Sequence, residues 1–240
     1  MDELAFHRAL FRAGTIVDVG AHDGALTLPL AALRGARVLA FEPLPPAFAR
    51  LEAAVRAAGR EGQVTLRREA LGVGPGRLAL EVPVVGGVAQ EQWASVAKDY
   101  AGIAAGDPRV ERILRWDVEV MALDSLGLVD VTAMKVDAEG AEEEVLRGAE
   151  ATLRRCMPVL TVEIEERHRI GSTRDVPRFL AGLGYRGFFS LDGIWRAVEE
   201  FDASVMQVAS PSPASFEASD PYVFVFGFVP AGREEELKKV

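Results

Sequence analysis

Short apolar runs, rich in β-branched residues, recur along the chain. The clearest is Thr15–Val19, which ends directly at Gly20. Uninterrupted runs of this length, bounded by turn residues, are typical of strands buried in a parallel sheet. The same pattern predicts strands at Arg37–Phe41, Val64–Leu66, Val118–Met121, Thr132–Val136, Pro158–Glu165, Tyr185–Ser190 and Tyr222–Val229.

Between these runs, apolar residues repeat at helical spacing. This spacing predicts amphipathic helices at Met1–Ala13, Ala25–Leu33, Ala47–Ala58, Ala141–Arg154 and Val176–Leu183. Strands that alternate with helices indicate an α/β fold with helices on both faces of the sheet. We therefore expect one domain over residues 1–240, with residues 1–14 as an N-terminal helix.

Three stretches depart from this alternation. Gly74-Pro75-Gly76 predicts a hairpin that joins strands at 70–73 and 77–84, and Asp192-Gly193 predicts a second hairpin turn. Residues 86–116 mix Gly, Ala and Ser with aromatic residues and a cluster of arginines, and residues 204–219 are rich in Ser, Pro and Ala. We interpret both as candidate lid or substrate loops, with an ordinary surface helix as the alternative for 86–116.

Composition narrows the class of protein. The 240 residues are 49% hydrophobic with a net charge of −9, so a nucleic-acid partner held by phosphate contacts is not expected, although a local basic patch is compatible with this charge. The single cysteine, Cys156, allows no intrachain disulfide and no cysteine-based metal site. The first fourteen residues are polar and contain no apolar run long enough for a signal peptide or a membrane span. We expect a cytoplasmic protein without membrane contact; its oligomeric state stays open, a homo-oligomer included.

The first strand and its turn carry the candidate chemistry. The order Asp18-x-Gly20-x-x-x-Gly24 places glycines where a buried strand turns into a helix, so the backbone can approach a ligand and the helix can offer free N–H groups. Glu42 follows the second strand about twenty residues after the first glycine. An acid at that position can accept hydrogen bonds from both hydroxyls of a ribose. The sequence therefore predicts an adenosine-containing ligand.

The acids beside the turn favour S-adenosylmethionine. A dinucleotide needs G-x-G-x-x-G because its pyrophosphate sits on the helix N-terminus, whereas Asp18 and Asp23 would repel phosphate and suit an ammonium group. A dinucleotide and a tight turn with a solvated acid are the alternatives. The Thr27 hydroxyl is a candidate donor to the cofactor carboxylate, or else bonds its own helix backbone. Glu69 is a candidate acceptor for the adenine amine, or else a solvated loop acid.

Several acids fall at the carboxyl ends of predicted strands, where open α/β sheets bind ligands. They are Asp18, Glu42, Asp137, Glu139 and Glu163. One such acid is weak evidence, because acids often cap helices, but several on one edge indicate a site. His168 follows shortly after and could act as a general base near neutral pH. An exposed loop histidine is the alternative.

With these motifs, the chain resembles the FkbM-type S-adenosylmethionine-dependent methyltransferases. The resemblance covers roughly Thr15–Glu165 and rests on VDVGAHDGALTL, VLAFEPLPPAFARLEAAV, EALGVGPGRLAL, LDSL, MKVDAEGAEEEVLRGAEATL and PVLTVEIE. It implies a Rossmann-like class I methyltransferase fold, with a seven-stranded, mostly parallel sheet whose last strand is antiparallel. It also implies O-methylation of a hydroxyl on a sugar or a polyketide-type small molecule.

The resemblance also assigns residues. Asp18, Gly20 and Gly24 match the cofactor turn, Glu42 matches the ribose acid, Ala70 falls in the adenine-side loop, and Asp137 and Glu139 match the acidic pair beside the transferred methyl. Together with Thr27 and Glu69, proposed above, Ala21, Pro43 and Asp137 complete the expected cofactor set. The chain departs from the family at His22, where asparagine is common, and at Asp23, where a small or apolar residue is common. These departures bear on the cofactor contacts at the turn.

These assignments predict methyl transfer from S-adenosylmethionine to a hydroxyl, with S-adenosylhomocysteine as product. The sulfonium is already activated, so the enzyme must align two reactants and remove one proton. Asp137, Glu139, Glu163 and His168 are the candidates to accept that proton. Alternatively, a divalent cation held by the three carboxylates would stabilise the alkoxide. Three rival hypotheses are a non-catalytic cofactor-binding protein, a nicotinamide-dependent oxidoreductase and methyl transfer to an amine.

Overall fold

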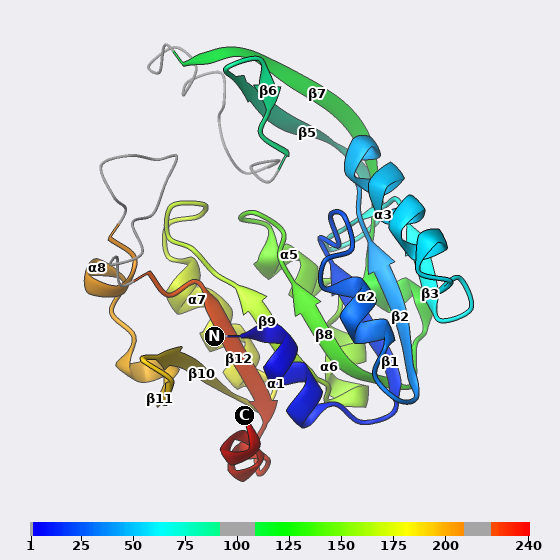
Figure 1. Cartoon of the computed structure of the whole chain (residues 1–240). Helices are drawn as coiled ribbons and strands as arrows, with labels where there is room; N and C mark the ends of the chain where they lie inside the picture. Colours follow the sequence, from blue (N-terminus) through cyan, green and yellow to red (C-terminus); the bar gives the residue numbers. More distant parts are fainter. Residues whose placement is uncertain (1, 92–108, 209–221) are drawn as a thin grey trace.

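The computed structural model describes residues 2–91, 109–208 and 222–240. Eight of its strands form one sheet: β1 Gly14–Val19, β2 Ala36–Phe41, β3 Val64–Arg67, β8 Val131–Val136, β9 Val159–Glu163, β10 Tyr185–Leu191, β11 Ile194–Ala197 and β12 Val225–Pro230. Their order is β11-β10-β12-β9-β8-β1-β2-β3 (Figure 1). The β1 residues are all buried, as expected for a central strand with parallel neighbours on both sides.

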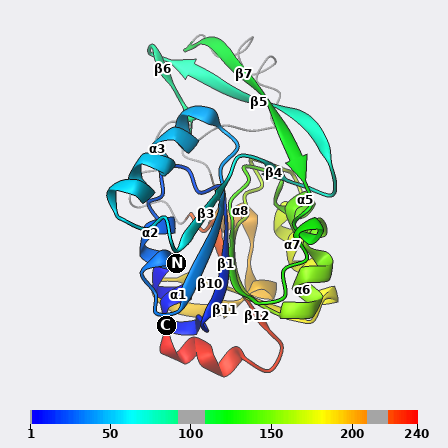
Figure 2. The same ribbon diagram turned by 90° about the vertical axis from the view of Figure 1, so that its right-hand side faces the viewer.

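Helices cover both faces of this sheet (Figure 2). On one face, α5 Glu142–Arg147, α6 Glu150–Cys156 and α7 Ser172–Gly182 pack their apolar residues on the sheet. On the other face lie α1 Glu3–Leu10, α2 Thr27–Ala31, α3 Pro45–Ala57 and the 3-10 helix η4 Glu234–Lys239. The shorter segments η2 Leu123–Leu126, η3 Val198–Glu200 and α8 Ala203–Met206 lie in the connections. The predicted α/β fold with helices on both faces is confirmed.

A second, four-stranded sheet has the order β4-β7-β5-β6. Its strands are β4 Ala70–Leu71, β5 Gly76–Val85, β6 Val88–Ala89 and β7 Val110–Met121. The long antiparallel pair β5–β7 arches beyond the carboxyl ends of the main-sheet strands (Figures 1 and 2). Leu80, Val82 and Val118 of this pair pack on Leu44 and Ala47 at the start of α3. The second sheet is therefore fixed above the edge at which ligands bind in α/β folds.

The last strand, β12, is antiparallel to β9 and β10, as the family resemblance implies. The main sheet has one strand more than the expected seven, because β10 continues through Asp192-Gly193 into β11. Asp192 and Gly193 both have positive φ (53° and 74°), the backbone that a tight hairpin turn requires. The predicted turn is confirmed, and the extra edge strand follows from it.

The predicted hairpin across residues 70–84 is wrong. β4 pairs in parallel with β7, and β5 pairs with the opposite edge of β7. The turn at Gly74-Pro75-Gly76 therefore carries the chain from one side of β7 to the other. A local turn motif could not reveal this arrangement, because the paired residues lie 25 to 50 positions apart along the chain.

The predicted helix at 141–154 is divided into α5 and α6. A Cβ on Gly148, where the division occurs, would lie only 1.8 Å from the Gly72 carbonyl oxygen, so the backbone of the second sheet approaches the helix closely here. The Asp124 carboxylate then accepts hydrogen bonds of 2.8 Å from the backbone N–H groups of Ala151 and Thr152. A side chain distant in sequence thus caps the new helix.

The two candidate lid segments are described only in part. Residues 88–89 belong to β6 and residues 110–116 to β7, while residues 92–108 lie outside the described residues. In the second segment, α8 reaches Met206, and residues 209–219 lie outside the described residues. No helix in the described part of the chain has the length and apolarity needed to cross a membrane.

Candidate functional site

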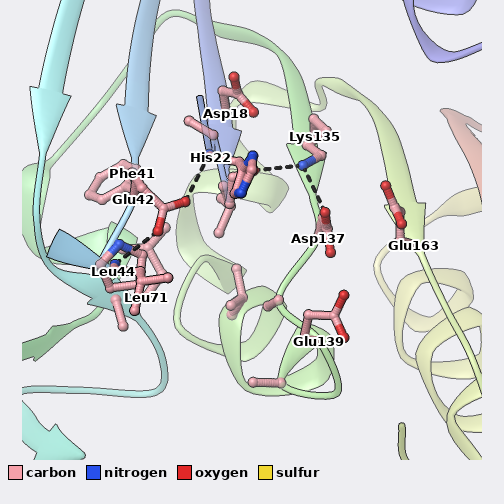
Figure 3. Close-up of a pocket in the computed structure, with 18 of the residues that line it drawn as sticks. Asp18, His22, Phe41, Glu42, Leu44, Leu71, Lys135, Asp137, Glu139 and Glu163 are labelled. Atoms are coloured by element: carbon pink, nitrogen blue, oxygen red, sulfur yellow. Dashed lines mark hydrogen bonds and ion pairs between the residues drawn. The ribbon is translucent and has the colours of Figure 1, made fainter. Parts of the chain in front are cut away.

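A cavity of about 480 Å³ lies at the carboxyl ends of β1, β2, β8 and β9. The turn after β1 and the acids at the strand ends form its floor and sides (Figure 3). Leu78 and Leu80 of β5 add an apolar wall. The cavity therefore lies between the main sheet and the second sheet, with a polar side and an apolar side.

The turn after β1 depends on residues with left-handed backbone. Gly20 has φ 73°, and a Cβ at this position would lie 2.1 Å from the Asp137 carbonyl oxygen. Only glycine therefore allows the ends of β1 and β8 to approach so closely. His22 has φ 50°, a conformation in which Asn, Asp and His are enriched among residues other than glycine. A histidine is therefore well suited to this position of the turn.

Glu42 is fixed by the same turn. Its carboxylate accepts hydrogen bonds of 2.8 Å from the backbone N–H groups of His22 and Leu44. The residue is buried, and burial raises the pKa of its carboxyl while the two backbone hydrogen bonds oppose this rise. An ionised carboxylate has about four lone-pair sites, so two remain for a ligand. Glu42 is a preoriented acceptor on the cavity wall.

Asp18 and Thr27 form a buried pair. The Thr27 hydroxyl donates a 2.6 Å hydrogen bond to Asp18 Oδ2, and Thr27 is fully buried and absent from the cavity wall. The structure therefore does not direct this hydroxyl to a cofactor carboxylate, because Asp18 already accepts it. Asp18 itself reaches the cavity wall. Within the described part of the chain its Oδ1 has no hydrogen-bond partner, although it is buried.

Lys135, which the sequence analysis did not select, occupies the centre of the site. Its Nζ donates to the Gly20 carbonyl oxygen at 2.9 Å and lies 3.2 Å from Asp137 Oδ2 (Figure 3). Burial lowers the pKa of this amine, but the charges of Asp137, Asp18 and Glu163 raise it, and the net shift is upward. The only signal in the sequence is a charged residue within the mostly apolar strand β8.

Three candidate acids share one side of the cavity: Asp137, Glu139 and Glu163 (Figure 3). Glu139 has φ 50°, a strained conformation that persists only where its surroundings hold it. The Glu142 carboxylate supplies that support, because its Oε1 accepts from the N–H groups on either side, at 3.1 and 2.9 Å. Burial raises the pKa of Glu142 to about 7. Burial, followed by the charge of Asp137, also raises the pKa of Glu163.

His168 lies behind this side of the cavity. Its Nε2 is 3.2 Å from Glu139 Oε2 and 3.4 Å from Glu165 Oε1, and its side chain is only 7% exposed. The alternative of an exposed loop histidine is therefore wrong. His168 is not part of the cavity wall, so the structure places it against Glu139 and not against the space for a substrate. The Tyr222 hydroxyl donates to Glu165 from the other side at 2.5 Å.

The remaining candidates surround the apolar end. Glu69 accepts hydrogen bonds from Arg67 Nε and Nη2 at 3.1 and 2.6 Å. Burial would raise the pKa of the Glu69 carboxyl, but the hydrogen bonds and charge of Arg67, together with backbone N–H groups, lower it overall. The Glu69 carboxylate is therefore paired with Arg67 and not simply solvated, and only part of its acceptor capacity remains for an adenine amine. It lines the cavity together with Ala21, Pro43 and Ala70.

The three carboxylates do not form a recognisable metal centre. Within the described ranges there is no group of three or more His, Cys, Asp or Glu side chains that could hold a metal ion. Lys135 already places a positive charge beside Asp137. Asp137, Glu139 and Glu163 line the same cavity, but each carboxylate has different neighbouring groups.

Comparison with known proteins agrees with this architecture. The family model described as "Methyltransferase FkbM domain" matches residues 18–186. A solved FkbM methyltransferase from Methylobacillus flagellatus KT is 15% identical, with a TM-score of 0.56 over 90% of this chain. The present chain spans only 43% of the length of that protein.

A second solved structure has the same fold. The precorrin-6y C5,15-methyltransferase from Geobacter metallireducens GS-15 is 14% identical, with a TM-score of 0.51. The match covers 95% of this chain and 86% of that one. A search among curated proteins found no match. At these identities the solved structures show the shared fold, and the family match rests on the sequence model.

Proposed function

Because the chain belongs to the FkbM methyltransferase family, we propose that it transfers a methyl group from S-adenosylmethionine to a hydroxyl of a sugar or polyketide-type small molecule. The observation that carries the proposal is Glu42, a buried carboxylate held by two backbone N–H groups at the end of β2. It lies at the position where an α/β nucleotide site binds ribose hydroxyls.

The cavity fits the cofactor on three counts. Glu42 retains acceptor sites for the ribose, and Leu71, Leu78 and Leu80 offer an apolar surface to a flat base. Asp18 provides a buried oxygen without a partner among the described residues, which suits a cationic methionine group. When bound, the cofactor would supply a methyl on a positively charged sulfur, which needs no further activation. The remaining tasks are to bind, to align and to accept one proton.

Asp137 and Glu139 would carry out the last task. Both line the cavity at the end of β8, and the strained backbone of Glu139 directs its carboxylate from a fixed loop. In this proposal they hold the acceptor hydroxyl in line with the methyl and take its proton. Glu163 completes the same side, and His168 orients Glu139. A side so rich in carboxylates would repel phosphate, so we propose a small, non-anionic acceptor.

The first test is calorimetric titration with S-adenosylmethionine and S-adenosylhomocysteine, with NADH as the control. We expect both methionine derivatives to bind and NADH to show no heat of binding. The opposite pattern would support an oxidoreductase. If a folded sample binds none of the three, the proposed function is wrong.

The second test is transfer of labelled methyl to a panel of hydroxylated sugars and polyketide-type compounds, each matched with its amino analogue. Transfer to the hydroxyl compounds supports the proposal, and transfer only to the amines would replace O-methylation by N-methylation. Asp137→Asn should remove transfer while leaving cofactor binding nearly unchanged. Full turnover by this variant would exclude Asp137 from the reaction. Repeating the assay after EDTA treatment tests whether the carboxylates also hold a divalent cation.

A further inference from the structure

We infer that Lys135 is a positioning residue, whose ammonium group fastens the cofactor turn to Asp137 and offsets the surrounding carboxylates. Its importance for catalysis rests on the proposed function. Its structural role does not, because every contact that supports it lies within the chain.

The first argument is geometric. The Lys135 side chain extends from β8 to the turn after β1, where Nζ donates to the Gly20 carbonyl oxygen. The same atom meets Asp137 Oδ2. The two chain ends are already in close contact, since the Asp137 N–H donates to the Val19 carbonyl oxygen at 3.2 Å. Lys135 therefore links the turn that would hold the cofactor with the acid that would meet the acceptor.

The second argument concerns charge. Four carboxylates from four elements act on the Lys135 ammonium: Asp18 from β1, Asp137 after β8, Glu163 from β9 and Glu3 from α1. Burial raises the pKa of Asp18, Glu3 and Glu163, and the charge of Lys135 lowers all three. The charge of Lys135 also acts on His7. Burial and this charge together lower the pKa of the His7 imidazole to about 4. In a buried site one cation therefore stabilises several anions.

This reasoning predicts a specific pH dependence. A carboxyl whose pKa is raised in the folded state costs stability as pH rises above its unfolded value. Without Lys135 the raised pKa values of Asp18 and Glu3 would rise further, so stability should fall more steeply between pH 5 and pH 8. Glu163, whose folded pKa of about 9 already lies above this range, contributes the same slope with and without Lys135. Lys135 itself stays charged in the folded and unfolded states across this window, because its folded pKa is raised. It therefore contributes no slope of its own.

The experiment compares Lys135→Met, which keeps an unbranched chain without charge, with Lys135→Arg, which keeps the charge. Lys238→Met is the matched control, since it removes one exposed positive charge on η4. Thermal unfolding of the unliganded proteins is followed at pH 5 and pH 8. Between pH 5 and pH 8, we expect the melting temperature of Lys135→Met to fall by about 5 °C more than that of wild type. The melting temperatures of Lys135→Arg and Lys238→Met should change with pH as that of wild type does.

If the melting temperature of Lys135→Met falls no more between pH 5 and pH 8 than that of wild type, the proposal that Lys135 offsets the charge of the carboxylates is wrong. If Lys135→Met does not fold at either pH, Lys135→Gln replaces it, because its amide also lacks charge and retains an N–H donor for Gly20. Titration with S-adenosylhomocysteine then tests positioning, and we expect binding by Lys135→Met to weaken about tenfold. An affinity within twofold of wild type would overturn that role. Absence of binding by wild type would instead overturn the proposed function, and the unfolding comparison would still decide the charge role.

Discussion

Glu42→Gln is the most informative single substitution in the cofactor site. The amide has nearly the shape of the carboxylate but only one acceptor oxygen. That oxygen can accept from the backbone N–H of His22 or of Leu44, which the two carboxylate oxygens now bind separately at 2.8 Å. The amide NH₂ group would then face the other N–H, donor against donor. The variant also presents at least one donor where a ribose hydroxyl would need an acceptor.

The expected loss of affinity follows from the hydrogen bonds. A hydrogen bond to a charged group contributes about 1.5–3 kcal/mol. Loss of one such bond to a ribose hydroxyl should raise the dissociation constant for S-adenosylhomocysteine roughly 10- to 150-fold. The free energy of unfolding of this variant should change less than its binding free energy. The unsatisfied N–H costs about 1–3 kcal/mol, but the neutral amide avoids the burial penalty that raises the pKa of the Glu42 carboxyl.

The assay is calorimetric titration of wild type, Glu42→Gln and the control Glu52→Gln, with melting temperatures measured in parallel. Glu52 is an exposed acid on the helix that follows, α3, where it pairs with Arg56 and does not line the cavity. Its variant should bind like wild type. A folded Glu42→Gln protein that binds within threefold of wild type would refute the assignment of the ribose acid. A variant that binds weakly only because it is unfolded would be recognised by its melting temperature.

Three further predictions concern the acid side and the turn. Gly20→Ala should abolish cofactor binding and lower the melting temperature, because its Cβ would lie 2.1 Å from the Asp137 carbonyl oxygen; wild-type values for both would contradict the described turn. Glu142→Gln keeps the oxygen that accepts both backbone N–H groups. Since the folded pKa of Glu142 is about 7 against 4.5, denaturant unfolding should show about 3 kcal/mol of added stability at pH 8 and less than about 0.5 kcal/mol at pH 4.5. His168→Gln should lower the rate of methyl transfer about tenfold with little change in the acceptor KM, because Glu139 loses orientation and not contact. A rate equal to wild type would remove His168 from the site.

Some features of the site follow from local sequence. The apolar run before Gly20 predicts a buried parallel strand whichever helices cover it, because burial on both faces needs only apolar side chains. Gly20, Gly24 and Glu42 could be selected because their roles depend on backbone conformation and on position at a strand end. The acids at the ends of β8 and β9 could be grouped for the same reason, since parallel strands end at one edge.

Other features depend on partners that are remote in sequence. The predicted hairpin at 70–84 is wrong because β7, whose residues lie 25 to 50 positions from their partners, pairs with both segments. The single helix at 141–154 failed because a backbone carbonyl of the second sheet approaches Gly148. Neither partner leaves a local signal, so periodicity alone could not predict these arrangements.

The chemistry of the acids divides in the same way. The sequence by itself determined which carboxylates gather at one edge, because the local pattern shows where each strand ends and parallel strands end at the same edge of a sheet. Only the tertiary structure decided what each one meets: Asp18 binds the Thr27 hydroxyl, Asp137 lies beside Lys135, and Glu139 is backed by His168. The physical reason is that protonation and hydrogen bonding depend on burial and on charges within a few ångströms. Folding alone brings those neighbours together.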